Sequence, residues 1–131
     1  MTASYRWVRW NRHKRVYDLA IAAACALFLA VFTGEILDSK CYLGAMKPGD
    51  GKGHKACATL CVTGGIPPML LVWTPDGGRR HLLLVDDRGH SARGLVLEAL
   101  GEPVTVTGRP GRTGDLETLA IDAHAIERLG R

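Results

Sequence analysis

The sequence lacks the patterns on which several functional classes depend. No Gly-Lys-Ser/Thr sequence ends its glycine-rich stretch 44–53, which excludes a phosphate-binding loop and nucleotide binding. It shows no Ser/His/Asp signature and no pair of carboxylates flanked by aromatic residues, so neither hydrolysis by a nucleophilic serine nor sugar hydrolysis has support. The chain of 131 residues also lacks internal repeats and low-complexity tracts, and its length allows one modest core. A catalytic role is therefore the less favoured expectation.

Acidic residues are absent from the first 15 positions, although five of the seventeen Lys and Arg residues lie there: Arg6, Arg9, Arg12, Lys14 and Arg15. The twelve that remain face thirteen Asp and Glu residues, so the formal net charge of +4 comes from the N-terminus. A domain without excess positive charge lacks the electrostatic footprint that a phosphate backbone requires. We therefore do not expect nucleic-acid binding.

A predominantly apolar segment, residues 16–33, follows the basic segment 1–15 and carries one acid, Asp18, near its start. As an α-helix, residues 16–32 of this segment span about 25 Å, a short but adequate membrane crossing. The excess of Lys and Arg before it places the N-terminus in the cytoplasm. We therefore predict a single-pass protein of the cell (inner) membrane with an extracytoplasmic, or periplasmic, domain over 34–131. A cleaved signal peptide is the alternative, because the apolar run is also of signal-peptide length.

The outer domain is predicted to be mainly β. Short strands are expected where apolar runs lie between turn residues, at 35–38, 69–74, 80–85, 103–109 and 116–121. Turns are expected at the Pro- and Gly-rich stretches 75–78 and 108–114. Short helices are expected over 54–61, over 91–100 with Leu95, Val96, Ala99 and Leu100 on one face, and from a cap at Asp122 to near Leu129.

The helix expected over 91–100 lies between the third and fourth strands, as the helix of an OB-fold does. We therefore predict a small OB-fold-like five-stranded barrel with one or two short helices. The stretch 38–68 then becomes a long loop between the first two strands, among the loops that OB-folds use for ligands. A β-sandwich or a split barrel would show a similar alternation of strands and turns.

The Cys and His residues of this loop carry the most specific chemistry. If 54–61 is helical, His54, Cys57 and Cys61 are spaced i, i+3 and i+7 and share a face, and Cys41 arrives from the preceding strand end. One imidazole and three thiolates match a tetrahedral zinc site, and soft sulfur donors also suit Cu(I), with Met46 and Met69 as further thioether candidates. We predict zinc or copper bound by Cys41, His54, Cys57 and Cys61.

Two other uses of the cysteines remain open. With Cys25 in the apolar segment, three cysteines lie outside, and one ordinary disulfide would leave an odd thiol. The CxxxC pair could also exchange disulfides, although its spacing differs from the usual CxxC. Near the cluster, we expect Asp38 to orient the ligand His54 without binding the metal itself. We expect Lys40 to lower the pKa of a neighbouring thiol.

The pattern Asp38-x-x-Cys41, His54, Cys57-x-x-x-Cys61, followed by Gly64-Gly65, resembles a group of bacterial exported domains in which it precedes OB-like strands. The likeness covers roughly 34–109 and implies an exported location and a Cys/His site, with no established activity. The chain is also similar to Sco-type copper assembly factors, which have one anchor helix, a CxxxC pair and a histidine. Those proteins have a thioredoxin fold with the histidine far downstream of the cysteines, whereas His54 precedes them here.

These observations lead to two functional hypotheses. The first is a membrane-anchored extracytoplasmic metal-binding or redox accessory protein that serves the assembly of a respiratory or metalloenzyme complex. The second is a non-catalytic structural subunit of a larger membrane complex, with an outer domain stapled by a disulfide.

Overall fold

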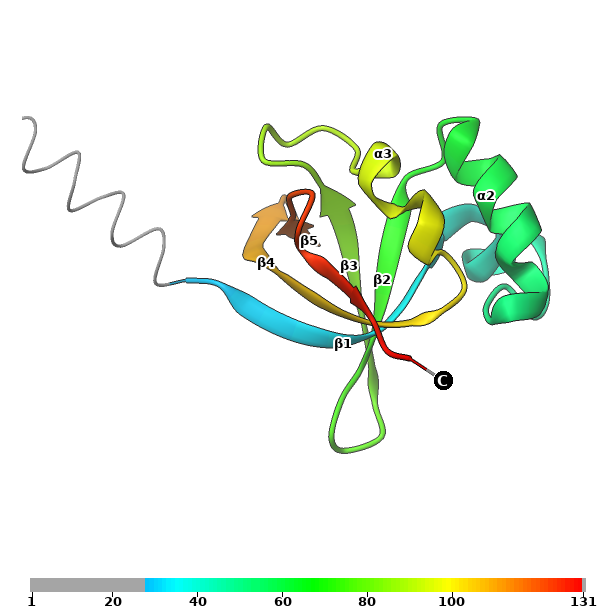
Figure 1. Cartoon of the computed structure of the whole chain (residues 1–131), viewed down its shortest axis with the longest axis horizontal. Coiled ribbons are helices and arrows are strands. Elements are labelled where there is room, and N and C mark those ends of the chain that lie inside the picture. The colour runs from blue at the N-terminus through cyan, green and yellow to red at the C-terminus, as the bar shows by residue number, and fades with distance from the viewer. Residues whose placement is uncertain (1–27, 131) are drawn as a thin grey trace, which may run out of the picture.

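Strands rich in leucine and valine form a closed barrel in residues 28–130, the part of the chain that the computed structural model describes (Figure 1). The five barrel strands are β1 (Ala30–Asp38), β2 (Pro68–Trp73), β3 (Arg79–Val85), β4 (Pro103–Thr113) and β5 (Leu116–Ala120). A short strand, β6 (Ile126–Arg128), pairs with β4.

β1 closes the barrel because it pairs with two neighbours along its length. Its first part, Ala30 to Glu35, runs antiparallel to β4, and its second part, Gly34 to Asp38, runs antiparallel to β2. β3 and β5 pair in parallel, which completes the order β1-β2-β3-β5-β4-β1. A Cβ atom on Gly34, where β1 changes partner, would overlap the backbone oxygen of Leu71. Glycine is therefore required at this corner of the barrel.

Four short helical segments and one longer helix connect the strands. η1 (Cys41–Ala45), η2 (Lys52–His54) and α2 (Lys55–Thr63) lie between β1 and β2, and α3 (Arg93–Val96) and η3 (Leu97–Ala99) lie between β3 and β4. α2 packs beside β1 in Figure 1 and buries Ala58 and Val62 in the main core. The core itself is formed by inward-facing aliphatic side chains, among them Ile36, Leu70, Leu82, Leu84, Val104, Val106 and Leu119. The barrel thus supports the segment between β1 and β2.

The predicted mainly β fold is confirmed as a closed five-stranded barrel with short helices. The strands expected at 69–74 and 80–85 lie within one residue of β2 and β3, and a turn joins them in which the Thr74 amide donates to the Gly78 carbonyl. A helical segment lies between β3 and β4, as expected. Within it the prediction for Leu95 is wrong, because this side chain is 36% exposed and Ala92 is buried instead.

The predicted membrane helix extends too far toward the C-terminus. Residues 30–33 belong to β1 and pair with β4, so the boundary expected after residue 33 is wrong. Phe32 packs against the barrel core, and the Arg80 guanidinium lies 5.6 Å from the centre of its ring. Aromatic and β-branched side chains suit such a half-buried strand. The pairing of residues 30–33 with β4 therefore decides their conformation, although their apolar pattern also suits a membrane helix.

The rest of the predicted helix, residues 16–27, and the basic segment 1–15 lie outside the described residues. In the described part of the chain, no helix has the length and apolar character needed to cross a membrane.

Two predictions near the C-terminus are also wrong. The turn expected over 108–114 is mostly strand, because β4 continues to Thr113 and pairs with β5. The helix expected from Asp122 to Leu129 is absent from the described residues, since 126–128 form β6. The Asp122 carboxylate accepts a hydrogen bond from the His124 amide at 2.8 Å, which makes a turn and sends the chain back along β4.

Candidate metal centre

The end of β1 organises the site through a buried carboxylate. Asp38 is the last residue of β1 and is fully buried. Its Oδ2 accepts a hydrogen bond from the backbone amide of Cys41 at 2.8 Å, which turns the chain immediately after the strand. Its Oδ1 lies 2.8 Å from Nε2 of His54, which is 5% exposed. One side chain therefore positions two predicted metal ligands that lie 13 residues apart in the sequence.

The glycine-rich loop between these ligands is held against β1 and η1. The Gly51 amide donates to Glu35 Oε1 at 2.6 Å, and Gly51 adopts a φ of 78°, in the region that favours glycine. Gly49 packs so closely on η1 that a Cβ atom there would lie 2.6 Å from the Tyr42 Cα. Burial raises the pKa of the Glu35 carboxyl, and the hydrogen bond from Gly51 opposes this effect. The loop delivers His54 to Asp38 because its glycines permit these approaches.

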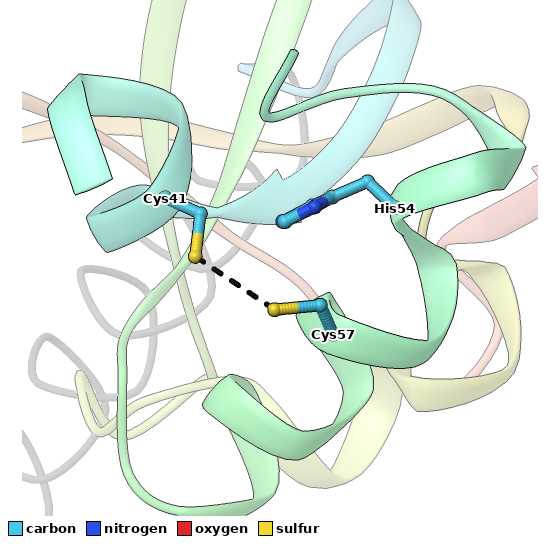
Figure 2. A group of neighbouring side chains, drawn as sticks. All are labelled: Cys41, His54 and Cys57. Carbon is cyan, nitrogen blue, oxygen red and sulfur yellow. Dashed lines mark hydrogen bonds between the residues drawn. The ribbon is translucent and has the colours of Figure 1, made fainter. Parts of the chain in front are cut away.

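Three sulfur atoms gather beside the His54–Asp38 pair. Cys41 Sγ lies 4.0 Å from Cys57 Sγ and 3.9 Å from Cys61 Sγ. Figure 2 shows the side chains of Cys41, His54 and Cys57 directed toward one another, Cys41 from the segment after β1 and the other two from η2 and α2. Cys41 is 4% exposed, whereas Cys57 and Cys61 are half-buried. The site is therefore closed on the barrel side and reached from α2.

The ligand atoms form two overlapping sets. Those of Cys41, His54 and Cys57 all lie within 4.8 Å of one another, and so do those of Asp38, Cys41 and Cys61. The structure thus brings three of the four predicted ligands into one set and places Cys61 in the other, with Cys41 common to both. The predicted contact of Asp38 with His54 is confirmed.

The two distances from Cys41 Sγ, to Cys57 Sγ and to Cys61 Sγ, each match the edge of a metal site and are too long for a disulfide. Metal–sulfur bonds of about 2.3 Å give edges of about 3.8 Å in a tetrahedral site and about 4.0 Å in a trigonal one. A disulfide requires sulfur atoms about 2.05 Å apart. The three cysteines of the described residues are free thiols, so the expected alternative of a structural disulfide is not realised among them.

Burial raises the pKa values of two of the thiols, Cys41 and Cys61. Burial, reinforced by hydrogen bonding to Asp38, raises the pKa of Cys41 to about 12. Burial also raises the pKa of Cys61, with a further contribution from the charge of Asp38. Burial alone would raise the pKa of the Asp38 carboxyl, but the hydrogen bonds from the Cys41 amide and His54 outweigh it and lower that pKa. The predicted lowering of thiol pKa by Lys40, an exposed side chain, is therefore wrong for Cys41 and Cys61.

The other predicted donors lie elsewhere. Met69 is buried against Leu37 and Leu71 in a small cluster with Tyr42, and Met46 is 44% exposed. Sequence reasoning missed the role of Glu35, whose only signal is an acid directly before the apolar residues Ile36 and Leu37. A scan against protein-family models, a search of curated proteins and a search of solved structures each found no match for this chain.

Proposed function

We propose that this protein is a metal-binding accessory protein that holds Zn²⁺ or Cu(I) with Cys41, His54, Cys57 and Cys61. The observation that carries the proposal is the buried Asp38–His54 contact of 2.8 Å beside sulfur atoms 3.9 and 4.0 Å apart. A histidine that binds a metal usually gives its other ring N–H to a carboxylate, which fixes the ring. With Nε2–H donating to Asp38, Nδ1 is the nitrogen left for the metal.

The donor set favours soft or borderline metals. Three thiols and one imidazole match the ligands of structural zinc sites, and thiolates equally suit Cu(I). The distances from Cys41 Sγ to Cys57 Sγ and to Cys61 Sγ exceed the edge of a tetrahedral zinc site by only about 0.2 Å. Cys61 would also have to approach His54 and Cys57 to complete one shell of four ligands. Half-buried Cys57 and Cys61 give the ion a route in and out, which suits a protein that passes metal to a partner.

The test is the metal content of the full-length chain, purified in mild detergent without chelator and under reducing conditions. We expect about one zinc or copper ion per chain, and loss of most of it in Cys57→Ser. Cys25→Ser is the matched control, because it removes a thiol that the predicted ligand set does not include. Absence of stoichiometric metal, or equal loss in both variants, would refute the proposal.

We also propose that the apolar segment before Ala30 tethers the barrel to the membrane, with the site facing a partner in a larger complex. Phe28, Leu29 and Val31 are exposed apolar residues at the start of β1, which supports an apolar environment there. The eight residue steps of β1 separate its start from Asp38 by about 26 Å, which would keep the site clear of a bilayer at residue 28. We expect the full-length chain to remain in carbonate-washed membranes and a variant without residues 1–27 to be lost from them. A soluble full-length chain would contradict the tether.

The barrel connectivity supports an OB-like assignment. A helical segment lies between the third and fourth strands, and the Cys/His residues occupy the connection between the first two strands. OB-folds use that connection for ligands. The location of the proposed site is thus the one that this architecture favours.

A further inference from the structure

We propose that the three thiols also form a two-electron redox centre in which Cys41 is the shared sulfur, bonding either to Cys57 or to Cys61 while these two never bond to each other. The observation behind this is that Cys41 Sγ lies 4.0 Å from Cys57 Sγ and 3.9 Å from Cys61 Sγ, and that Cys41 belongs to both sets of neighbouring ligand atoms whereas Cys57 and Cys61 belong to different sets. This centre would regulate metal binding, because a disulfide removes two of the thiolate ligands and releases the metal, and that role rests on the proposed function.

The helix prevents the bond that the sequence pattern alone favours. Cys57 and Cys61 are four residues apart within α2, where Cβ atoms at this spacing lie about 5–6 Å apart. A disulfide requires Cβ atoms about 3.5–4.5 Å apart. Joining them would unwind α2, which buries Ala58 and Val62 in the main core. The CxxxC pair is therefore held apart by the fold.

Cys41 is free of this constraint because it belongs to another segment. It lies at the start of η1, and the residues that follow, 43–48, are all exposed, which leaves this segment room to adjust. Each bond requires the two sulfur atoms to approach by about 2 Å. The distances to Cys57 and Cys61 are nearly equal, so either bond can form and the third thiol stays free.

An external disulfide, on a small molecule or a partner protein, serves as the oxidant. A thiolate of half-buried Cys57 or Cys61 attacks one of its sulfur atoms, which forms a mixed disulfide and releases the first external thiol. The Cys41 sulfur, which is 4% exposed, then attacks the protein sulfur of that mixed disulfide and displaces the second external thiol. Two protein thiols lose two electrons and two protons, and the external disulfide gains them. Reduction by a dithiol reverses the process and restores the ligands.

The test maps disulfides in the metal-free full-length chain, prepared in the Cys25→Ser background so that only the three site thiols contribute. The chain is treated with glutathione disulfide, its free thiols are alkylated, and its peptides are identified by mass spectrometry. We expect Cys41–Cys57 and Cys41–Cys61 bonds, with two glutathione thiols released per bond formed. Cys57→Ser and Cys61→Ser should each still form an internal disulfide. Cys41→Ser, which retains two thiols, should form none and carry glutathione instead.

A Cys57–Cys61 bond as the main product, or an internal disulfide formed as readily in Cys41→Ser as in the parent chain, would overturn the proposal. The map of the parent chain gives this answer even if Cys41→Ser does not fold. Metal content of the reduced protein separates the two proposals. Bound metal without Cys41 disulfides refutes the redox centre alone, and Cys41 disulfides without metal binding refute the proposed function alone.

Discussion

At the scale of single residues, the site depends on one carboxylate with two partners. Asp38 is fully buried, and an ionised carboxylate is costly to bury unless hydrogen bonds compensate it. The Cys41 amide and the His54 ring provide these hydrogen bonds, which at the same time orient both residues. The geometry of the ligands is therefore coupled to the ionisation of Asp38.

Asp38→Asn should weaken metal binding without abolishing it. The amide offers one carbonyl oxygen where the carboxylate offers two, so it cannot accept hydrogen bonds from both the Cys41 amide and His54 in the present geometry. We expect the Kd for Zn²⁺, measured by competition with a chromogenic chelator, to rise about 10–100-fold. Asp122→Asn, which alters an exposed turn carboxylate, is the control. Equal affinities of the two variants would remove Asp38 from the site.

Metal affinity should rise steeply with pH, because metal must displace protons from thiols whose pKa values are raised. Burial raises the pKa of Cys41 to about 12 and also raises that of Cys61, so both thiols are protonated in the metal-free protein at neutral pH. Each proton released strengthens binding about tenfold per pH unit. Titrations between pH 6 and 8 should therefore show affinity increasing about a hundredfold or more per unit. An affinity that does not change over this range would show that these thiols are not ligands.

At the scale of secondary-structure elements, the barrel depends on glycines where a strand changes partner. β4 pairs with β1 up to Gly108 and with β5 from Arg109 onward. A Cβ atom on Gly108 would lie 2.6 Å from the backbone oxygen of Ala120, which cannot move without breaking the sheet. The same reasoning applies to Gly34 in β1.

Gly108→Ala should therefore destabilise the protein by about 1–3 kcal/mol, as overpacking of a closed core does. Gly94→Ala is the matched control, because no heavy atom lies within 4 Å of its added Cβ and its position in α3 favours alanine. Urea denaturation followed by circular dichroism measures both. If the two variants unfold at the same urea concentration, Gly108 is not a point of close strand contact.

Elements with strong local signals were predictable from the sequence. One such signal is the pair of apolar runs, joined by a turn, that form β2 and β3. Another is the i, i+3, i+7 spacing of His54, Cys57 and Cys61, which indicates a helical segment. The errors fall where a distant strand decides the conformation. Residues 30–33 look helical by composition but pair with β4, 108–113 look like a turn but pair with β1 and β5, and 126–128 pair with β4.

The same distinction applies to the site. Its donor residues could be predicted because few residue types bind zinc or copper. Their division into two sets around Cys41 could not, because it depends on how η1 folds back from β1 and on the contact of Glu35 with Gly51. The contacts Glu35–Gly51 and Cys41–Cys57 each join residues that are 16 positions apart in the sequence. No local pattern encodes such tertiary contacts.

At the scale of the whole molecule, a closed barrel presents a Cys/His site at the end of β1 opposite the point where the chain enters it (Figure 1). The central claim is that this site holds a metal through sulfur and one imidazole. X-ray absorption at the metal edge of the full-length chain tests it most directly. We predict a first shell dominated by sulfur at about 2.3 Å with one nitrogen at about 2.0–2.1 Å, the nitrogen lost in His54→Ala and kept in His124→Ala. A shell of oxygen and nitrogen alone, or a chain that binds no metal, would contradict the account.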